Sequence, residues 1–308
     1  GAAWHPQADG DTGQILSVAG QMRLRLISPL FIAALIALPG CSRPRPAQAR
    51  PALFVVRDAD TTIWVLGTMH ALPANVAWET PAITRAIDGA DMLVTEIPRS
   101  EPGVVSEMFM GLARSDGLPP VTSRVAAPVR PALLRAIDAA DESASTLDKL
   151  ETWAAALVIE NGRTRAAGAS PTDGVEAVLA KRFAGHPQRA FETPGSQLAL
   201  FDHLSEPDQR RLLTLAATDS DGYRRALTAW LTGNLATMTR SNDQLFVDAP
   251  AMKAALLTGR NTRWSRWIAA RMRRPGKVLV AVGAGHLAGP SSLIAMLRAS
   301  GLTVRRLQ

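Results

Sequence analysis

The sequence of 308 residues contains a single cysteine, Cys41. One thiol excludes an intramolecular disulfide, so the fold must be stabilised by its apolar core. A cysteine nucleophile would have to be Cys41 itself, and the segment that precedes this residue predicts a different use for it.

Aromatic and lysine side chains are also scarce. Aromatic residues make up 5% of the chain, and only four residues are lysines although the formal net charge is +7. Nucleic-acid-binding proteins usually combine a basic stripe with interleaved aromatic side chains, and neither is evident in this sequence. We interpret the arginine surplus as solvated surface and expect no nucleic-acid partner.

Apolar residues are plentiful enough for a sizeable core. They make up 47% of the chain, which argues against intrinsic disorder. The length fits one large domain, or a domain with a helical insertion.

The N-terminal segment predicts a lipid anchor. A short basic region begins at Met22, residues 26–38 are apolar, and Leu38-Pro-Gly-Cys41 follows. This order is typical of a bacterial lipoprotein signal with a lipobox cysteine. The predicted organisation is a non-native or mis-called extension at 1–21, a signal peptide at 22–41, a tether at 42–52 and a folded domain at 53–308.

An acylated Cys41 would attach the protein to a membrane of the bacterial cell envelope, facing the periplasm. The residue after it, Ser42, is not the aspartate associated with retention in the inner membrane, which favours the outer membrane. The alternative is an ordinary secretory signal, or an uncleaved anchor, with an incidental cysteine.

Short apolar runs bounded by glycine or proline predict strands near both ends of the chain. They cover residues 53–56, 62–67, 92–98, 278–282 and 302–307, with one short strand near 188–194. Between 104 and 272 the pattern is mainly helical. We therefore predict a mixed α/β (α+β) fold, with a central sheet built from N- and C-terminal strands, flanking helices and a large helical middle segment.

Histidine and glutamate residues stand at the ends of four predicted strands. His70 and His286 each follow a strand in a Gly-x-x-His pattern, and Glu96 and Glu192 lie near the ends of two others. Open α/β sheets place their ligand crevice at the carboxyl ends of strands, so these side chains could converge. Two imidazoles with one or two carboxylates suit a divalent metal that keeps a position for water, and hydrolysis is its natural chemistry.

Each of these residues also has a purely structural interpretation. Either histidine could be a loop residue that hydrogen-bonds the backbone. Glu96 could pair with an arginine, because a buried carboxylate needs a partner. Glu192 could cap a helix that begins near Gly195.

The chain resembles the TraB/GumN family, which includes the animal Tiki proteases, from about Leu53 to Leu307. The likeness rests on the two Gly-x-x-His motifs, on Glu96 in Leu-Val-Thr-Glu, on Phe191-Glu192-Thr and on Arg260-Asn261. Gly259 replaces the acid that the family commonly has before this Arg-Asn pair.

The resemblance implies a fold like that of the erythromycin-esterase and ChaN-like proteins, with a metal-dependent hydrolytic site. His70, Glu96 and His286 would form the metal-binding or catalytic set, with Mn, Co or Zn as the divalent metal. Glu192 and Arg260 would support them, Arg260 by stabilising negative charge on a tetrahedral intermediate. In the Tiki branch the reaction is peptide cleavage, which implies a peptide or protein substrate.

Three hypotheses about function are compatible with these observations. The first is a lipid-anchored metallohydrolase, peptidase-like, in which a metal-activated water attacks an amide. The second is a non-catalytic envelope protein that binds a peptide signal, haem or a polysaccharide precursor on the same fold. The third is hydrolysis without a metal, in which the histidines act as general bases.

Overall fold

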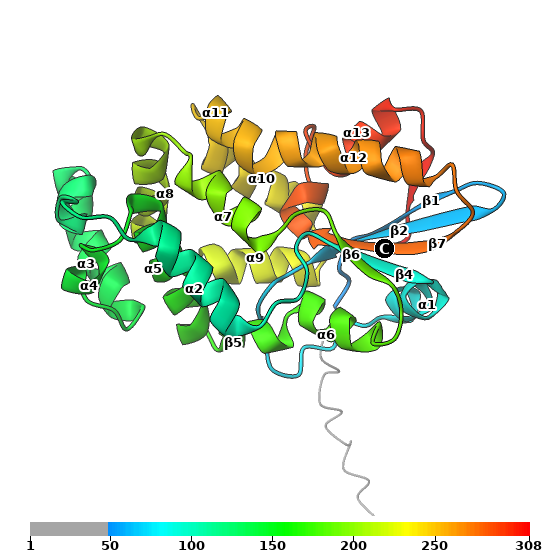
Figure 1. Cartoon of the computed structure of the whole chain (residues 1–308), viewed down its shortest axis with the longest axis horizontal. Helices are drawn as coiled ribbons and strands as arrows, with labels where there is room; N and C mark the ends of the chain where they lie inside the picture. Colours follow the sequence, from blue (N-terminus) through cyan, green and yellow to red (C-terminus); the bar gives the residue numbers. More distant parts are fainter. Residues whose placement is uncertain (1–48) are drawn as a thin grey trace, which may run out of the picture. The chain divides into compact units, whose positions relative to one another are not determined.

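The computed structural model describes residues 49–308, and Figure 1 shows the helices and strands that they form. The predictions for the signal peptide, for Cys41 and for most of the tether concern residues outside this range. Within residues 49–308, no helix is both long enough and apolar enough to cross a bilayer.

A six-stranded mixed sheet forms the centre of the fold, in the order β6-β4-β7-β2-β1-β8. The four strands β6, β4, β7 and β2 are parallel neighbours, whereas β1 runs antiparallel to both β2 and β8. The strands are β1 Leu53–Arg57, β2 Thr61–Thr68, β4 Met92–Thr95, β6 Gln188–Ala190, β7 Gly276–Gly283 and β8 Val304–Arg306. The predicted mixed sheet, built from strands near both ends of the domain, is confirmed.

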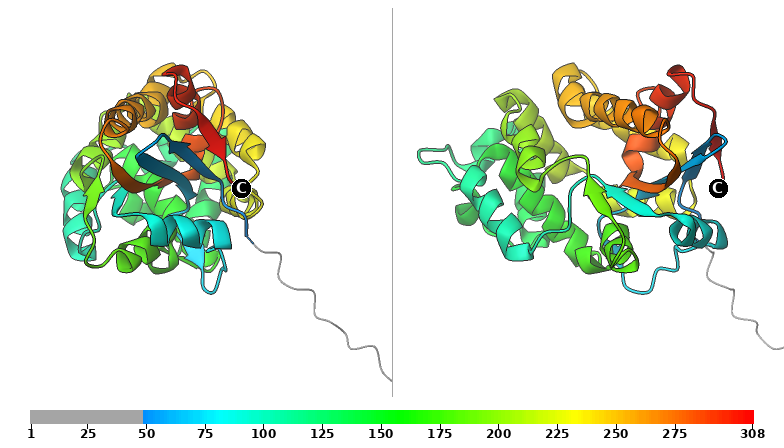
Figure 2. Two further views of the ribbon diagram at one scale, coloured as in Figure 1. Left: turned by 90° about the vertical axis from the view of Figure 1, so that its right-hand side faces the viewer. Right: turned by 45° about the vertical axis from the view of Figure 1, so that its right-hand side comes forward.

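The central strands are continuous apolar runs because both faces of the sheet are covered. In β7, Val278, Val280 and Val282 belong to the core on one face, while Leu279 and Ala281 belong to the core on the other. Helices α12 (Gly259–Arg271) and α13 (Leu293–Ala299) cover the first face. Helices α1 (Pro81–Gly89) and α6 (Val175–Arg182) cover the second, as Figures 1 and 2 show.

The middle of the chain is mainly helical, as predicted. Its remaining helices are α2 Pro102–Ala113, α3 Arg130–Ala139, α4 Ala144–Leu147, α5 Thr152–Ala166, α7 Pro194–Asp202, α8 Glu206–Thr218, α9 Gly222–Leu231, α10 Leu235–Phe246 and α11 Pro250–Lys253. Helices α3, α5 and α8 enclose a core of their own around Leu133, Trp153 and Leu213. A two-stranded sheet pairs β3 (Leu72–Pro73) with β5 (Ala169–Ser170).

Two details differ from the sequence-based expectations. The strand predicted over residues 92–98 ends at Thr95, because the chain turns there and the Thr95 hydroxyl donates to the Ile97 carbonyl. Helix α10 forms within the mainly helical middle although its threonine, serine, asparagine and aspartate residues are weak helix formers and predict no helix there. Its first turn is stabilised by the Asn234 side chain, which accepts from the Thr237 N–H.

Candidate functional site

The four parallel strands end at one edge of the sheet, and each is followed by one of the predicted site residues. In the order of the sheet, Glu192 follows β6, Glu96 follows β4, His286 follows β7 and His70 follows β2. Carboxyl ends of parallel strands share an edge, so residues more than 200 positions apart in the chain come together there.

Gly283, at the end of β7, lies at the centre of this convergence. Its N–H donates to Oε1 of Glu96 at 2.6 Å. A Cβ on this residue would lie 3.1 Å from that same oxygen and 3.6 Å from Nε2 of His70. The φ angle of Gly283 is an ordinary −49°, so the site requires glycine there for space rather than for its backbone conformation.

Arg260, in the first turn of α12, connects three of the four strand ends. Its Nη2 donates to Glu96 at 2.6 Å and to Glu192 at 2.8 Å, and its Nε donates to Glu192 at 3.0 Å. Its Nη1 lies 3.0 Å from Nε2 of His286. A π-turn over residues 254–258 precedes α12, and such turns often occur where a helix presents a functional side chain.

The alternative in which Glu192 caps α7 is wrong. Thr193 is the N-cap, and it forms a reciprocal capping box with Ser196. Glu192 instead pairs with Arg260 and, at 3.5 Å, with Arg263. The alternative partner proposed for Glu96, an arginine, is present as Arg260.

His286 is held in one tautomer by its neighbours. Nδ2 of Asn261 donates to the Ser291 carbonyl, so Oδ1 of Asn261 faces His286 and accepts from Nδ1–H at 2.7 Å. The ring lies against Trp264, 4.5 Å between centroids. Burial lowers the pKa of His286 to about 4, with Arg260 and His70 acting in the same direction against Glu96. His286 is therefore neutral at neutral pH, and its Nε2 accepts a hydrogen bond from Arg260.

Glu96 is buried and ionised. Burial by itself raises the pKa of Glu96, but the charges of His286, His70 and Arg260 and the Gly283 N–H lower it to about 2. Because His286 is neutral at pH 7, Arg260 and His70 supply the positive charge there. Gln197 of α7 also donates to Oε2 of Glu96, at 3.1 Å.

The sequence reasoning missed Glu176, the partner of His70. Oε1 of Glu176 lies 2.8 Å from Nδ1 of His70 and accepts a further hydrogen bond from the Thr68 hydroxyl. Glu176 raises the pKa of His70 above its usual range, although 68% of the His70 side chain is exposed and water screens part of this attraction. The other carboxylate oxygen of Glu176, Oε2, is buried without a hydrogen-bond partner in the structure.

Gly174 explains how Glu176 reaches this position. A Cβ on Gly174 would overlap the carbonyl oxygen of His70, so only glycine lets the start of α6 approach the loop after β2. The N–H of Val175 then donates to the Met69 carbonyl at 3.0 Å. The sequence Asp173-Gly-Val places this glycine two positions before Glu176.

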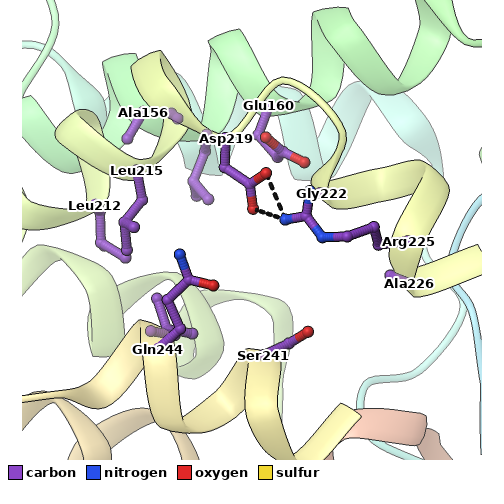
Figure 3. Close-up of a pocket in the computed structure, with 13 residues that line it drawn as sticks. Ala156, Glu160, Leu212, Leu215, Asp219, Gly222, Arg225, Ala226, Ser241 and Gln244 are labelled. Carbon is purple, nitrogen blue, oxygen red and sulfur yellow. Dashed lines mark hydrogen bonds and ion pairs between the residues drawn. The ribbon is translucent and has the colours of Figure 1, made fainter. Parts of the chain in front are cut away.

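A cavity of about 320 Å³ opens onto these residues, and His70, Glu96, Glu176 and Gln197 line it. It is as large as the smaller ligand pockets of proteins. A different cavity of about 300 Å³ lies among α5, α8, α9 and α10, where Asp219 pairs with Arg225 (Figure 3). No predicted site residue lines that second cavity.

The carboxylate oxygens and imidazole nitrogens at the site are ligand types that suit a divalent cation. Oε1 of Glu96 and Nε2 of His286 are 3.9 Å apart, a separation that two ligands of one ion can have when each bond is about 2 Å. Oxygen partners hold Nδ1 of both histidines, which is a common arrangement around metal-binding imidazoles. Two features of the structure oppose cation binding. Nε2 of His286 already accepts a hydrogen bond from Arg260. Among residues 49–308, no three His, Cys, Asp or Glu side chains lie in positions from which they could hold one metal ion.

The fold and this arrangement define a mixed α/β protein with a histidine, glutamate and arginine site at the carboxyl edge of its parallel strands. Residues 52–306 match the model of the TraB/PrgY/gumN family, so the chain belongs to that family. The resemblance inferred from the motifs is thereby confirmed. No curated protein and no solved structure matches the chain significantly.

Proposed function

We propose that the protein is a hydrolase that cleaves an amide, with its reactive centre at His70, Glu96 and His286. One observation carries the proposal: these three residues, from strands far apart in the sequence, converge around Gly283, and two of them, His70 and Glu96, line a cavity large enough for a small substrate segment.

The chain's own residues provide most of a hydrolytic site. Glu96 is an ionised carboxylate beside two imidazoles, and Nε2 of His70 lies next to Gly283 while Glu176 holds Nδ1. The five N–H groups of Arg260 are directed at Glu192, Glu96, His286 and the Leu256 carbonyl. In this arrangement Arg260 orients Glu96 and His286, and its predicted contact with a tetrahedral intermediate requires one of these bonds to open.

We further propose that His70, Glu96 and His286 hold a divalent cation, Mn, Co or Zn. Such a cation, when bound, lowers the pKa of its water and polarises the carbonyl that is attacked. For this set to bind it, Arg260 must release Nε2 of His286, and Nε2 of His70 must be deprotonated. Cation binding should therefore release protons and weaken as the pH falls.

The experiment compares His70→Ala and His286→Ala with the control His186→Ala. His186 is exposed and does not line the cavity at the site. Bound metal after dialysis against Mn, Co or Zn and cleavage of a fluorogenic peptide library are measured on each protein. We expect both site variants to lose bound metal and at least about 100-fold in cleavage rate, as for ligands of catalytic metals. Unchanged metal content and cleavage in both variants would refute the proposal.

Hydrolysis without a metal is the second candidate, and the His70–Glu176 pair favours it. A carboxylate that holds Nδ1 of an exposed histidine is the arrangement by which general acid–base histidines are oriented. Because Glu176 raises the pKa of His70, general-base catalysis by His70 would increase with pH through that elevated pKa. Cleavage that survives chelators and still requires His70 would select this mechanism.

We also propose that the protein is anchored to the cell envelope through lipidated Cys41, facing the periplasm and favouring the outer membrane. The basis is the signal-like order of residues 22–41. In a bacterial host, Cys41→Ser should move the protein from the membrane fraction to the soluble fraction. Equal membrane fractionation of both proteins would contradict acylation.

A further inference from the structure

A third cavity, larger than the two described above, adjoins the candidate site. It measures about 680 Å³, and two residues, Val105 of α2 and Pro171, line both this cavity and the one that holds His70 and Glu96. The two cavities are therefore neighbours that share a wall at these residues.

The chain connects the two cavities at two further points. His70 lines the site cavity and Ala71, the next residue, lines the larger one. On α7, Gln197 contacts Glu96 and lines the site cavity, while Leu198 lines the larger one. We call the two cavities together the extended groove; it runs from the reactive centre to the helices α2, α5 and α7.

The larger part of the groove combines apolar and polar side chains. Val105, Phe109, Leu157 and Leu198 provide apolar surface. Ser106, Asn161 and Thr164 line the same cavity with hydroxyl and amide groups. A simple acyl chain would need only the apolar part. An extended polypeptide needs both, since its side chains bury apolar surface and its backbone amides require hydrogen-bond partners.

Helix α2 presents different residues to the groove and to solvent. Val105 and Phe109 line the groove, whereas the neighbouring Val104 and Met108 are 47% and 42% exposed and line neither cavity. Phe109 is fixed from behind by an edge-on contact with Trp153, with ring centroids 5.4 Å apart. This contact restricts the position of the Phe109 ring, as a specificity pocket requires of its lining side chains.

We propose that the extended groove binds an apolar side chain of a polypeptide substrate, a short distance along the chain from the bond that is cut. Val105, Phe109, Leu157 and Leu198 determine this preference, and Ser106, Asn161 and Thr164 bond the substrate backbone. The inference rests on the proposed function, because it takes the reactive centre to lie at His70, Glu96 and His286.

The test uses two substitutions that differ by one position on the same helix. Val105→Asp places a charge in the groove, and Val104→Asp places the same charge on the exposed side of α2. The probes are a fluorescein-labelled decapeptide rich in leucine and phenylalanine and a counterpart in which serine replaces both residues. Fluorescence anisotropy measures binding, and the fluorogenic peptide library measures which bonds are cut.

We expect the apolar decapeptide to bind the wild type and Val104→Asp equally and to bind Val105→Asp at least about tenfold more weakly. The serine counterpart should bind all three proteins weakly. Thr164→Trp, which fills the groove without adding charge, should also weaken binding of the apolar peptide. This variant keeps the test valid if Val105→Asp does not fold.

The outcomes separate this inference from the proposed function. Binding that depends on Val105 and not on Val104, without cleavage of any peptide, supports the groove and refutes the hydrolase. Cleavage whose sequence preference is the same in wild type, Val105→Asp and Thr164→Trp supports the hydrolase and overturns the groove. Absence of both binding and cleavage overturns both.

Discussion

At the scale of single residues, the site depends on the absence of a side chain at position 283. The N–H of Gly283 binds Glu96, and the space above its Cα is shared by Glu96, His70 and His286. Apolar strand ends commonly carry glycine because the chain turns there. In this case the glycine keeps a side chain out of the candidate site.

Gly283→Ala should therefore impair activity far more than stability. The new Cβ would lie 3.1 Å from Oε1 of Glu96, so the carboxylate must shift by a few tenths of an ångström. Small displacements of reacting groups cost about 100-fold in rate, and we expect a loss of that order in peptide cleavage. Gly111→Ala, at a helical position with open space, is the control. Activity in Gly283→Ala equal to that of the control would contradict this role.

Residue patterns predicted the strand-end residues but not Glu176, the partner of His70. His70, Glu96, Glu192 and His286 could be located because each follows a short apolar run, and strand ends are where a sheet exposes ligand groups. Glu176 could not, because it is one polar residue in the first turn of a helix. Helices commonly carry acidic residues there to stabilise their N-terminus, so nothing in the sequence distinguished this one.

At the scale of secondary-structure elements, the buried side chain of Arg260 links α12 to the ends of three strands. Arg260 pairs with Glu96 after β4 and with Glu192 after β6, and it donates to His286 beyond β7. The same side chain lies over the Trp264 ring, 4.7 Å from its centroid. Its removal would leave the buried carboxylates of Glu96 and Glu192 without the one buried cation that contacts both.

Arg260→Met should destabilise the protein by about 3 kcal/mol or more, the usual cost of removing one partner from a buried ion pair. Arg263→Met is the matched control. Arg263 lies on the same helix and also pairs with Glu192, but its side chain is 58% exposed, so its loss should cost less than about 1 kcal/mol. Urea unfolding of both variants at neutral pH measures the difference. Equal destabilisation would show that the buried pairs do not hold α12 to the sheet.

Elements buried on both faces were the easiest to predict. β2 and β7 contain unbroken apolar runs because helices cover both faces of the sheet, whereas the parallel pairing of these two strands was not predicted. The paired two-residue strands β3 and β5 have no period to recognise, and α10 depends on an asparagine cap and on tertiary contacts rather than on helix propensity.

At the scale of the whole molecule, the described domain has separate apolar cores in its sheet and in its helical middle. Glu160 of α5 faces the cavity among α5, α8, α9 and α10 that Figure 3 shows. Burial raises the pKa of Glu160, Arg163 opposes this shift and Asp219 reinforces it. This carboxyl therefore binds its proton more tightly in the folded protein than in the unfolded chain.

The difference between the folded and unfolded pKa of Glu160 determines how this carboxyl changes the free energy of unfolding with pH. A carboxyl with a raised folded pKa stabilises the fold below its unfolded pKa, about 4.3, and the contribution is lost as the pH rises through the folded value. Glu160→Gln replaces the carboxyl with a neutral amide of similar shape. The substitution should leave the free energy of unfolding nearly unchanged at about pH 4 and increase it by up to about 1 kcal/mol at about pH 8.

Glu107→Gln is the control, because Glu107 lies on the exposed side of α2. The quantity to compare is the pH-dependent part of each substitution's effect on the free energy of unfolding. If Glu160→Gln instead destabilises the protein at pH 8, the ionised carboxylate is stabilised by Arg163 more than burial penalises it. The attraction between the charges of Glu160 and Arg163 would then contribute to the stability of the helical middle.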